Sequence, residues 1–163
     1  MPLTPFHLGH GLFIGEIFEK RINLISILLA SILVDVRTAY CFFNGCLPLH
    51  GLVHTFIGAT VLAFFITIGV YYFRKGLQKI TNLFKIKQNY SLSSIIAGSL
   101  IGVWVHIILD SFMHFDITPF WPIEENPLLG LISNGLNYYL CTAALVLGLI
   151  IYIYKFTKNK NQI

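Results

Sequence analysis

Charged residues are scarce in this chain, and the short motifs of several common enzyme classes are missing from it. Lysine, arginine, aspartate and glutamate make up 11% of the 163 residues, and hydrophobic residues make up 56%. That balance lies well outside the range of soluble domains. There is no close cysteine pair to hold zinc, no Gly-x-Ser-x-Gly nucleophile motif and no glycine-rich phosphate loop. The sequence therefore excludes a cysteine-based zinc site, a serine hydrolase built on that motif and a P-loop enzyme.

Cysteine is rare as well, with three residues in the chain. Cys41 and Cys46 flank a turn and could form a disulfide if that turn faces an oxidising compartment. Cys141 lies within an apolar run, where a small packing residue is expected. The cysteines thus leave open which compartment the turn faces.

Long apolar segments dominate the chain and predict membrane-spanning helices. Three of them are nearly free of charge and close to the ~20 residues that a helix needs to cross a bilayer. A fourth carries Asp35 and Arg37 in its second half, so it can span only if these side chains face protein. The four segments are residues 22–43, 55–73, 92–109 and 136–154.

A shorter apolar stretch, residues 6–18, precedes them. Its glycines would allow close packing against a neighbouring helix, and its start lacks the features of a cleavable signal peptide. We expect a re-entrant or half-spanning helix here. The predicted fold is therefore all-α: a polytopic membrane bundle of four long helices plus this short one, in a single domain over residues 1–163.

The basic residues predict how the bundle is oriented. Residues 74–87 hold five basic residues and no acid, and three more lysines lie in the C-terminal tail. By the positive-inside rule, the basic loop 74–90 and the C-terminus should be cytoplasmic in an integral protein of the cell membrane. Loop 111–135, rich in proline and aromatic residues, should then lie at the outer interface together with Met1. This clustering is unlike a nucleic-acid-binding surface, so no nucleic acid partner is expected, and the oligomeric state is not predicted.

All six histidines and all three aspartates fall in four short clusters with apolar flanks. The clusters are residues 6–10, 34–37, 50–54 and 106–116. Ionisable residues at membrane depth are costly, so they tend to face the protein interior and to mark a site. With the orientation above, the clusters meet in one layer near the outer end, provided that the N-terminus enters from outside.

The spacing within these clusters is typical of metal ligands on helices. His106, Asp110 and His114 would project from one stripe of a helix, and His50 and His54 would lie one turn apart. Imidazole with carboxylate favours zinc or a similar divalent ion over calcium, and the number of ligands allows one or two ions. The predicted metal ligands are His7, His10, His50, His54, His106, Asp110 and His114.

Three further residues are candidates for catalysis. Asp35 or Asp116 would accept a proton, and Arg37 would hold an anionic group such as phosphate. Each motif also has a simpler interpretation, such as an interfacial histidine pair, a hydrogen-bonded helix end or an Asp35–Arg37 ion pair. Glu16 and Glu19 are expected to form a solvated helix end. The convergence of four clusters favours a metal site.

The same motifs resemble the YdjM-like family of predicted membrane-bound metal-dependent hydrolases, over roughly Met1 to Tyr154. The segments that carry the resemblance are TPFHLGHG at 4–11, Asp35, HGLVHTFIGA at 50–59, HIILDS at 106–111, Asp116 and PFWP at 119–122. The resemblance implies an integral membrane protein with a hydrolase assignment.

Two functions follow as hypotheses. The first is a metal-dependent hydrolase at the outer membrane face that acts on a membrane lipid, either a phospholipid or a lipid-linked phosphate. The alternative is a non-enzymatic membrane protein that binds or transports metal ions.

Overall fold

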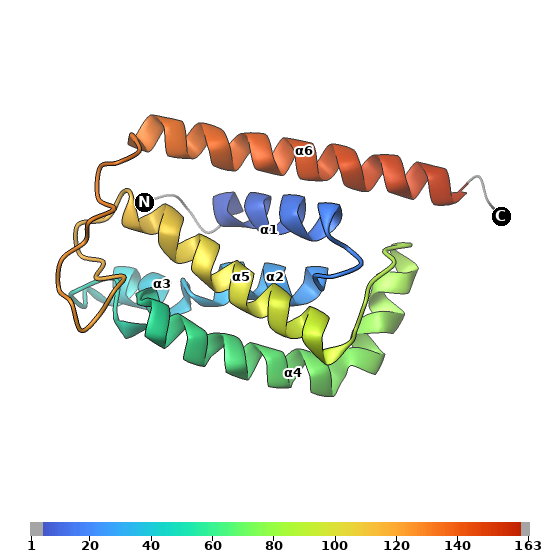
Figure 1. Ribbon diagram of the computed structural model, residues 1–163, viewed down its shortest axis with the longest axis horizontal. Helices are drawn as coiled ribbons and strands as arrows, with labels where there is room; N and C mark the ends of the chain where they lie inside the picture. The colour runs from blue at the N-terminus through green and yellow to red at the C-terminus, as the bar shows by residue number, and fades with distance from the viewer. Residues whose placement is uncertain (1–4, 161–163) are drawn as a thin grey trace.

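A computed structural model describes residues 5–160, which fold into helices without any strand (Figure 1). The elements are α1 (Pro5–Ile17), α2 (Leu24–Leu33), α3 (Val36–Asn44), the 3₁₀ turn η1 (Leu52–His54), α4 (Phe56–Leu83), α5 (Leu92–Ser111) and α6 (Asn134–Lys160). Four stretches are long and apolar enough to cross a membrane: Leu24–Asn44, Phe56–Leu83, Leu92–Ser111 and Asn134–Lys158. The predicted all-α bundle of four long helices and one short N-terminal helix is confirmed.

Helices α2 and α5 form the middle of the bundle. Half of each of these spans is buried, whereas only 28% of the α4 span and 22% of the α6 span are. Helix α4 packs on one side of this pair, and α1 lies between α2 and α6 (Figure 1). Apolar faces of α4 and α6 are therefore left for lipid.

Small residues allow the helices to approach closely. A Cβ atom on Gly9 would lie 2.6 Å from the carbonyl oxygen of Cys141, so α1 packs backbone to backbone on α6. A Cβ atom on Gly102 of α5 would lie 2.5 Å from the Cβ atom of Ala30 in α2. Close contact at small residues is how helices associate where lipid removes the hydrophobic driving force.

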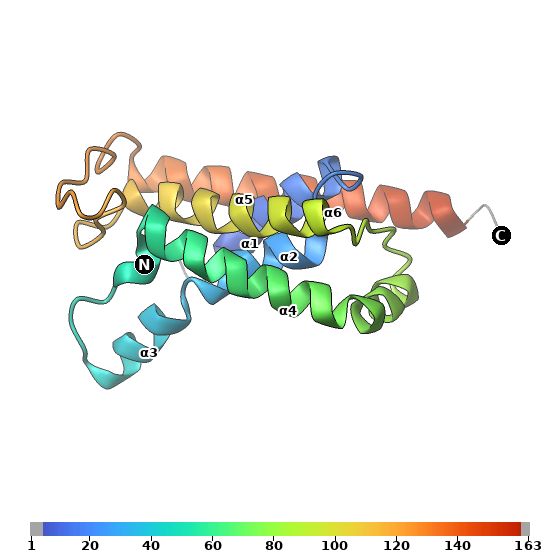
Figure 2. The same ribbon diagram turned by 60° about the horizontal axis from the view of Figure 1, so that its bottom comes forward.

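The second span is broken, which the sequence did not predict. Helix α2 ends at Leu33 and α3 begins at Val36, so Asp35 lies in the junction. Figure 2 shows α3 leaving the axis of the bundle. After α3 the chain reverses at Gly45, whose φ of 69° favours glycine, and Cys41 and Cys46 form a disulfide across this turn.

Helix α4 is longer than its apolar segment, so the prediction of a basic loop from residue 74 onwards is partly wrong. The helix continues to Leu83, and the connection to α5 is limited to residues 84–91. Lysine and arginine are good helix formers, so the helix can extend beyond its apolar part. Its last turns bend towards the C-terminal part of α6 (Figure 1).

The two ends of the bundle differ in their ionisable residues. We call one the His/Asp end, where α4 and α6 begin, α5 ends and residues 112–133 form a loop. The other is the basic end, where α1, α4 and α6 finish and α5 begins. Every lysine and arginine of residues 5–160 except Arg37 belongs to a segment at the basic end. Met1 lies outside the described residues.

Candidate metal centre

Four buried side chains from three separate parts of the chain meet at the His/Asp end. Asp35 comes from the α2–α3 junction, His54 from η1, and His106 and Asp110 from the last turns of α5. Each offers one ligand atom, and these atoms all lie within 4.8 Å of one another. We call these four residues the first group.

The distances within the first group match a coordination sphere. His106 Nε2 lies 3.3 Å from Asp35 Oδ1 and 3.2 Å from Asp110 Oδ2. His54 Nε2 lies 3.5 Å and 3.7 Å from the same two oxygens. A tetrahedral zinc ion with bonds of ~2.0–2.1 Å keeps its ligand atoms about 3.3–3.4 Å apart. Charge-assisted hydrogen bonds are shorter, at ~2.7–2.9 Å.

Two of these ligand atoms also lack a hydrogen-bond partner. Among the described residues none is found for His54 Nε2 or His106 Nε2, although both atoms are buried. Leaving such atoms unsatisfied is costly. A divalent cation bonded to these nitrogens and oxygens would remove that cost, so the residues present fit a metal ion.

The ring of His106 is oriented by α2. Its Nδ1 lies 2.9 Å from the carbonyl oxygen of Ser31. A carbonyl oxygen can only accept, so Nδ1 carries the proton and donates it. Nε2 is then the nitrogen that faces Asp35 and Asp110, as in metal-binding histidines whose other nitrogen donates to a backbone carbonyl.

A second group shares Asp110 with the first. His50, Asp110 and His114 also have ligand atoms within 4.8 Å of one another. The rings of His50 and His114 lie 4.5 Å apart between centroids. Asp110 is thus placed to bridge two adjacent sites.

Asp116 orients His50. His50 Nδ1 donates to Asp116 Oδ1 at 2.8 Å, and the backbone N–H of His50 donates to Oδ2 at 3.2 Å. Burial opposes ionisation of this carboxyl group, but the two hydrogen bonds from His50 hold the pKa of Asp116 below its ordinary value. A carboxylate in this position leaves Nε2 of His50 for a metal ion.

The N-terminal histidines have different surroundings. His7 is buried, its Nε2 lies 3.0 Å from Asp110 Oδ1, and its ring stacks on His106 at 4.1 Å. His10 is half-buried and belongs to neither group. His7 thus belongs to neither group but contacts the shared Asp110, as expected of a residue near the site, whereas His10 stands apart.

Arg37 contacts the loop that leads to His50. Its guanidinium donates to the carbonyl oxygens of Leu49 at 2.9 Å and Pro48 at 3.3 Å. Within residues 5–160 it forms no ion pair, so the Asp35–Arg37 pair considered above is not formed. Arg37 supports the loop and lies outside both groups.

The predicted helical spacing is confirmed for His106 and Asp110, which lie one turn apart on α5. His114, His50 and His54, however, do not lie on α-helices as expected. Helix α5 ends at Ser111, so His114 lies in the turn that follows, where its N–H donates to the carbonyl oxygen of Asp110 at 2.9 Å. His50 and His54 precede α4, because Thr55 caps that helix by accepting from the N–H of Gly58.

Two asparagines that the sequence did not single out fix this end of α5. Asn126 Nδ2 donates to the carbonyl oxygens of Ser111 at 2.9 Å and His114 at 3.3 Å. The buried Asn137 donates to the carbonyl oxygen of Leu109 at 2.8 Å. These amides satisfy carbonyls that a helix end leaves free. No local sequence pattern reveals this role, because Asn126 lies in a loop and Asn137 in an apolar helix, each well separated in the chain from the carbonyl that it contacts.

Burial keeps two of the histidines neutral. It lowers the pKa of His54 and, despite nearby carboxylates, that of His114. Neutral imidazole is the form that binds metal, so at neutral pH these rings need not lose a proton first.

The comparisons agree with this description. The YdjM inner membrane protein family matches residues 2–162, so the chain belongs to that family and is an integral membrane protein. No curated protein and no solved structure matches it.

Proposed function

We propose that this member of the YdjM family is a membrane-embedded metal-dependent hydrolase with two divalent ions, zinc being the first choice. The observation that carries the proposal is the position of Asp110, whose carboxylate belongs to both groups of ligands. Hydrolases that use two ions hold them ~3.5–4 Å apart between shared ligands.

Each residue then has a role. Asp35, His54, His106 and Asp110 would hold one ion, and His50, His114 and Asp110 the other, with His7 beside the shared carboxylate. Bound there, the ions would supply a hydroxide nucleophile and polarise the oxygen of a phosphate ester. Asp116 keeps His50 in position through two hydrogen bonds.

The surroundings favour a lipid substrate. Phe115 is 86% exposed next to the second group, and Phe120 and Trp121 are exposed in the same loop. Exposed aromatic residues of membrane proteins concentrate at the interface with lipid headgroups. The remaining nitrogens of Arg37 would hold the phosphate, because guanidinium matches its geometry. A phospholipid or lipid-linked phosphate is the proposed substrate.

The proposed orientation places the His/Asp end outside. Excess lysine and arginine at the basic end favours the cytoplasmic side for that end. The Cys41–Cys46 disulfide, at the opposite end, is of a kind that persists in oxidising compartments. An impermeant maleimide should label Leu131→Cys in intact cells and Lys79→Cys only after lysis. The reverse pattern would overturn the orientation.

The function is tested on protein purified in detergent. Metal content is measured per chain, and hydrolysis of phosphomonoester and phosphodiester lipids is assayed for the wild type and His54→Gln. We expect close to two ions per wild-type chain, and loss of both an ion and activity in the variant. Folded protein that binds no added zinc would contradict the proposal. Metal bound without hydrolysis of any lipid would favour the alternative, a metal-binding or metal-transport protein.

A further inference from the structure

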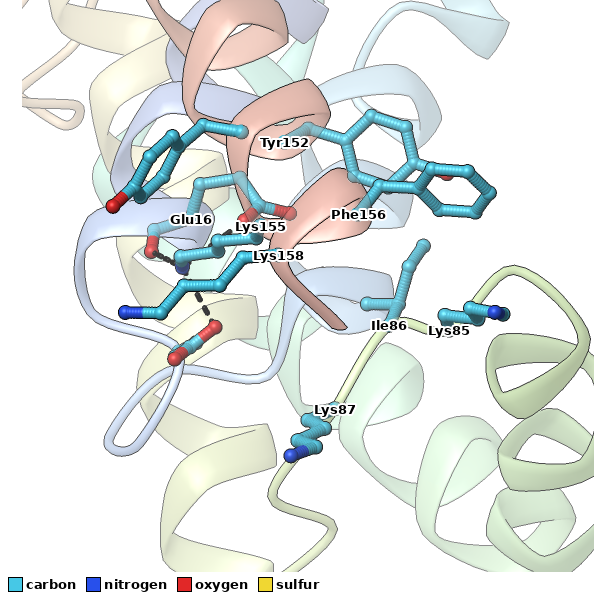
Figure 3. Close-up of a pocket in the computed structure, with 10 residues that line it drawn as sticks. Glu16, Lys85, Ile86, Lys87, Tyr152, Lys155, Phe156 and Lys158 are labelled. Carbon is cyan, nitrogen blue, oxygen red and sulfur yellow. Dashed lines mark hydrogen bonds and ion pairs between the residues drawn. The ribbon is translucent and has the colours of Figure 1, made fainter. Parts of the chain in front are cut away.

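We infer that the basic end holds a second binding site, for the phosphate group of an anionic membrane lipid. A pocket of about 350 Å³ opens there between the end of α1, the α4–α5 connection and the last turns of α6 (Figure 3). It lies at the opposite end of the bundle from the His/Asp centre, and nothing in the proposed hydrolysis uses it.

The charged residues of this pocket divide into two sets. Lys155 Nζ donates to Glu19 Oε2 at 2.6 Å and to Glu16 Oε2 at 3.1 Å. Dashed lines in Figure 3 mark the contacts of Lys155. Glu16 is buried, contrary to the solvated helix end expected from the sequence. Both glutamates are therefore occupied by one lysine.

Three more lysines line the same pocket: Lys85, Lys87 and Lys158. None of them forms an ion pair in the part of the chain that the structure describes. The four lysines and two glutamates give the lining a formal net charge of +2. The surplus positive charge comes from these three lysines, which have no acidic partner among the described residues. An anion can therefore bind to them without displacing the contacts of Lys155 with the glutamates.

The position of the pocket indicates where that anion comes from. Tyr152 and Phe156 of α6 form part of its wall, and α6 there emerges from the apolar part of its span. Tyrosine and lysine together at the end of a span mark the depth of lipid headgroups. Basic pockets between membrane helices on the cytoplasmic side bind the headgroups of anionic lipids. We therefore commit to a lipid phosphate as the ligand, with free phosphate as the competing source.

The experiment measures lipid binding to the full chain after delipidation in detergent, by native mass spectrometry. Phosphatidylglycerol is titrated against phosphatidylcholine, and inorganic phosphate is then added as a competitor. The test variant is Lys85→Gln with Lys87→Gln. The matched control is Lys75→Gln with Lys79→Gln, which removes the same charge from exposed positions on α4 outside the pocket.

We expect the wild type to prefer phosphatidylglycerol and the pocket variant to bind it about tenfold to thirtyfold more weakly. The control should lose less than about threefold, and millimolar inorganic phosphate should not displace the lipid. An equal loss of phosphatidylglycerol affinity in the pocket variant and in the control would mean that the lipid responds to general surface charge and not to this pocket. Equal binding of the two lipids, or displacement by inorganic phosphate, would overturn the assignment to a lipid. Bound metal should be unchanged in both variants, so this result and the hydrolase test are independent.

Discussion

Two carboxylates of equal burial, one at each end of the bundle, have opposite surroundings. The side chains of Asp110 and Glu16 are each 3% exposed. Glu16 receives hydrogen bonds from Lys155, whose charge balances it. Asp110 is surrounded by histidines: His7 Nε2 lies 3.0 Å from its Oδ1, and His106 Nε2 lies 3.2 Å from its Oδ2. A buried carboxylate is stabilised by a cation or by hydrogen-bond donors. Arg37, the one lysine or arginine described at the His/Asp end, donates to the carbonyl oxygens of Pro48 and Leu49 instead.

The difference indicates what each end can do. At the basic end Lys155 already balances the buried glutamate, so a ligand of the remaining lysines is not needed to complete a buried charge. At the His/Asp end only histidines surround the shared carboxylate, and a cation from outside would complete it. A metal ion would therefore contribute to folding at that end as well as to chemistry. The variants below disturb one end or both and are ordered from the largest expected effect to the smallest.

Asp110→Asn should have the largest effect, because it removes a charge and a ligand from both groups at once. We expect loss of both ions and a fall in hydrolysis on the order of 10³-fold, since a metal ion supplies several kcal/mol of transition-state stabilisation. Metal content per chain and initial rates check this. The matched control is Glu16→Gln, which should lower thermal stability and leave metal content unchanged. Equal loss of metal in both would contradict the contrast between the two ends.

Gly9→Ala should disturb both ends together, because α1 carries His7 at one end and Glu16 at the other. The new methyl group would collide with the backbone of α6 at Cys141, and overpacking of this kind costs ~1–3 kcal/mol. Gly69→Ala in α4 is the control, since a Cβ atom there meets nothing within 4 Å. We expect it to be neutral or slightly stabilising. Unfolding in detergent measures the stability of each variant. Equal stabilities of Gly9→Ala and Gly69→Ala would argue against the close α1–α6 contact.

Asp116→Asn should weaken only the second group, because Asp116 acts through His50. Loss of a carboxylate that orients a ligand typically reduces metal affinity by about 10–100-fold. A zinc titration should show one weakened and one unchanged site. Glu124→Gln, at an exposed position in the same loop, should change neither. If both sites weaken equally, the division into two groups is wrong.

The sequence predicted the convergence of the site better than its local geometry. Histidine and aspartate occur only in four apolar-flanked clusters. The structure gathers all three aspartates and five histidines at one end: His7, His50, His54, His106 and His114. The physical reason is the cost of ionisable groups in a membrane, which acts on any such residue regardless of local structure. The length and apolar composition of the segments likewise predicted the four spans.

What the sequence could not predict depends on contacts between distant residues. Asn126 holds the C-terminal end of α5 by donating to the carbonyl oxygen of Ser111. Asp35, in the α2–α3 junction, faces His54 and His106 from other parts of the chain. Glu16 and Glu19 pair with Lys155, well over a hundred residues away, rather than with solvent. Local patterns carry no information about such pairings, because the partner is chosen by packing of whole helices.

Arg37→Lys should give the smallest effect and tests the one basic residue found at the His/Asp end among those described. Lysine keeps the charge but loses the forked donors that fit both a loop carbonyl and a phosphate. We expect KM for a phosphate-bearing lipid to rise by roughly tenfold, the size of one charge-assisted hydrogen bond, with ion content unchanged. Arg74→Lys at the basic end, where Arg74 lies over the Tyr71 ring at 3.9 Å, is the matched control and should leave KM as it is. An unchanged KM together with a weakened second metal site would instead show that Arg37 acts only by holding the Pro48–Leu49 loop in front of His50.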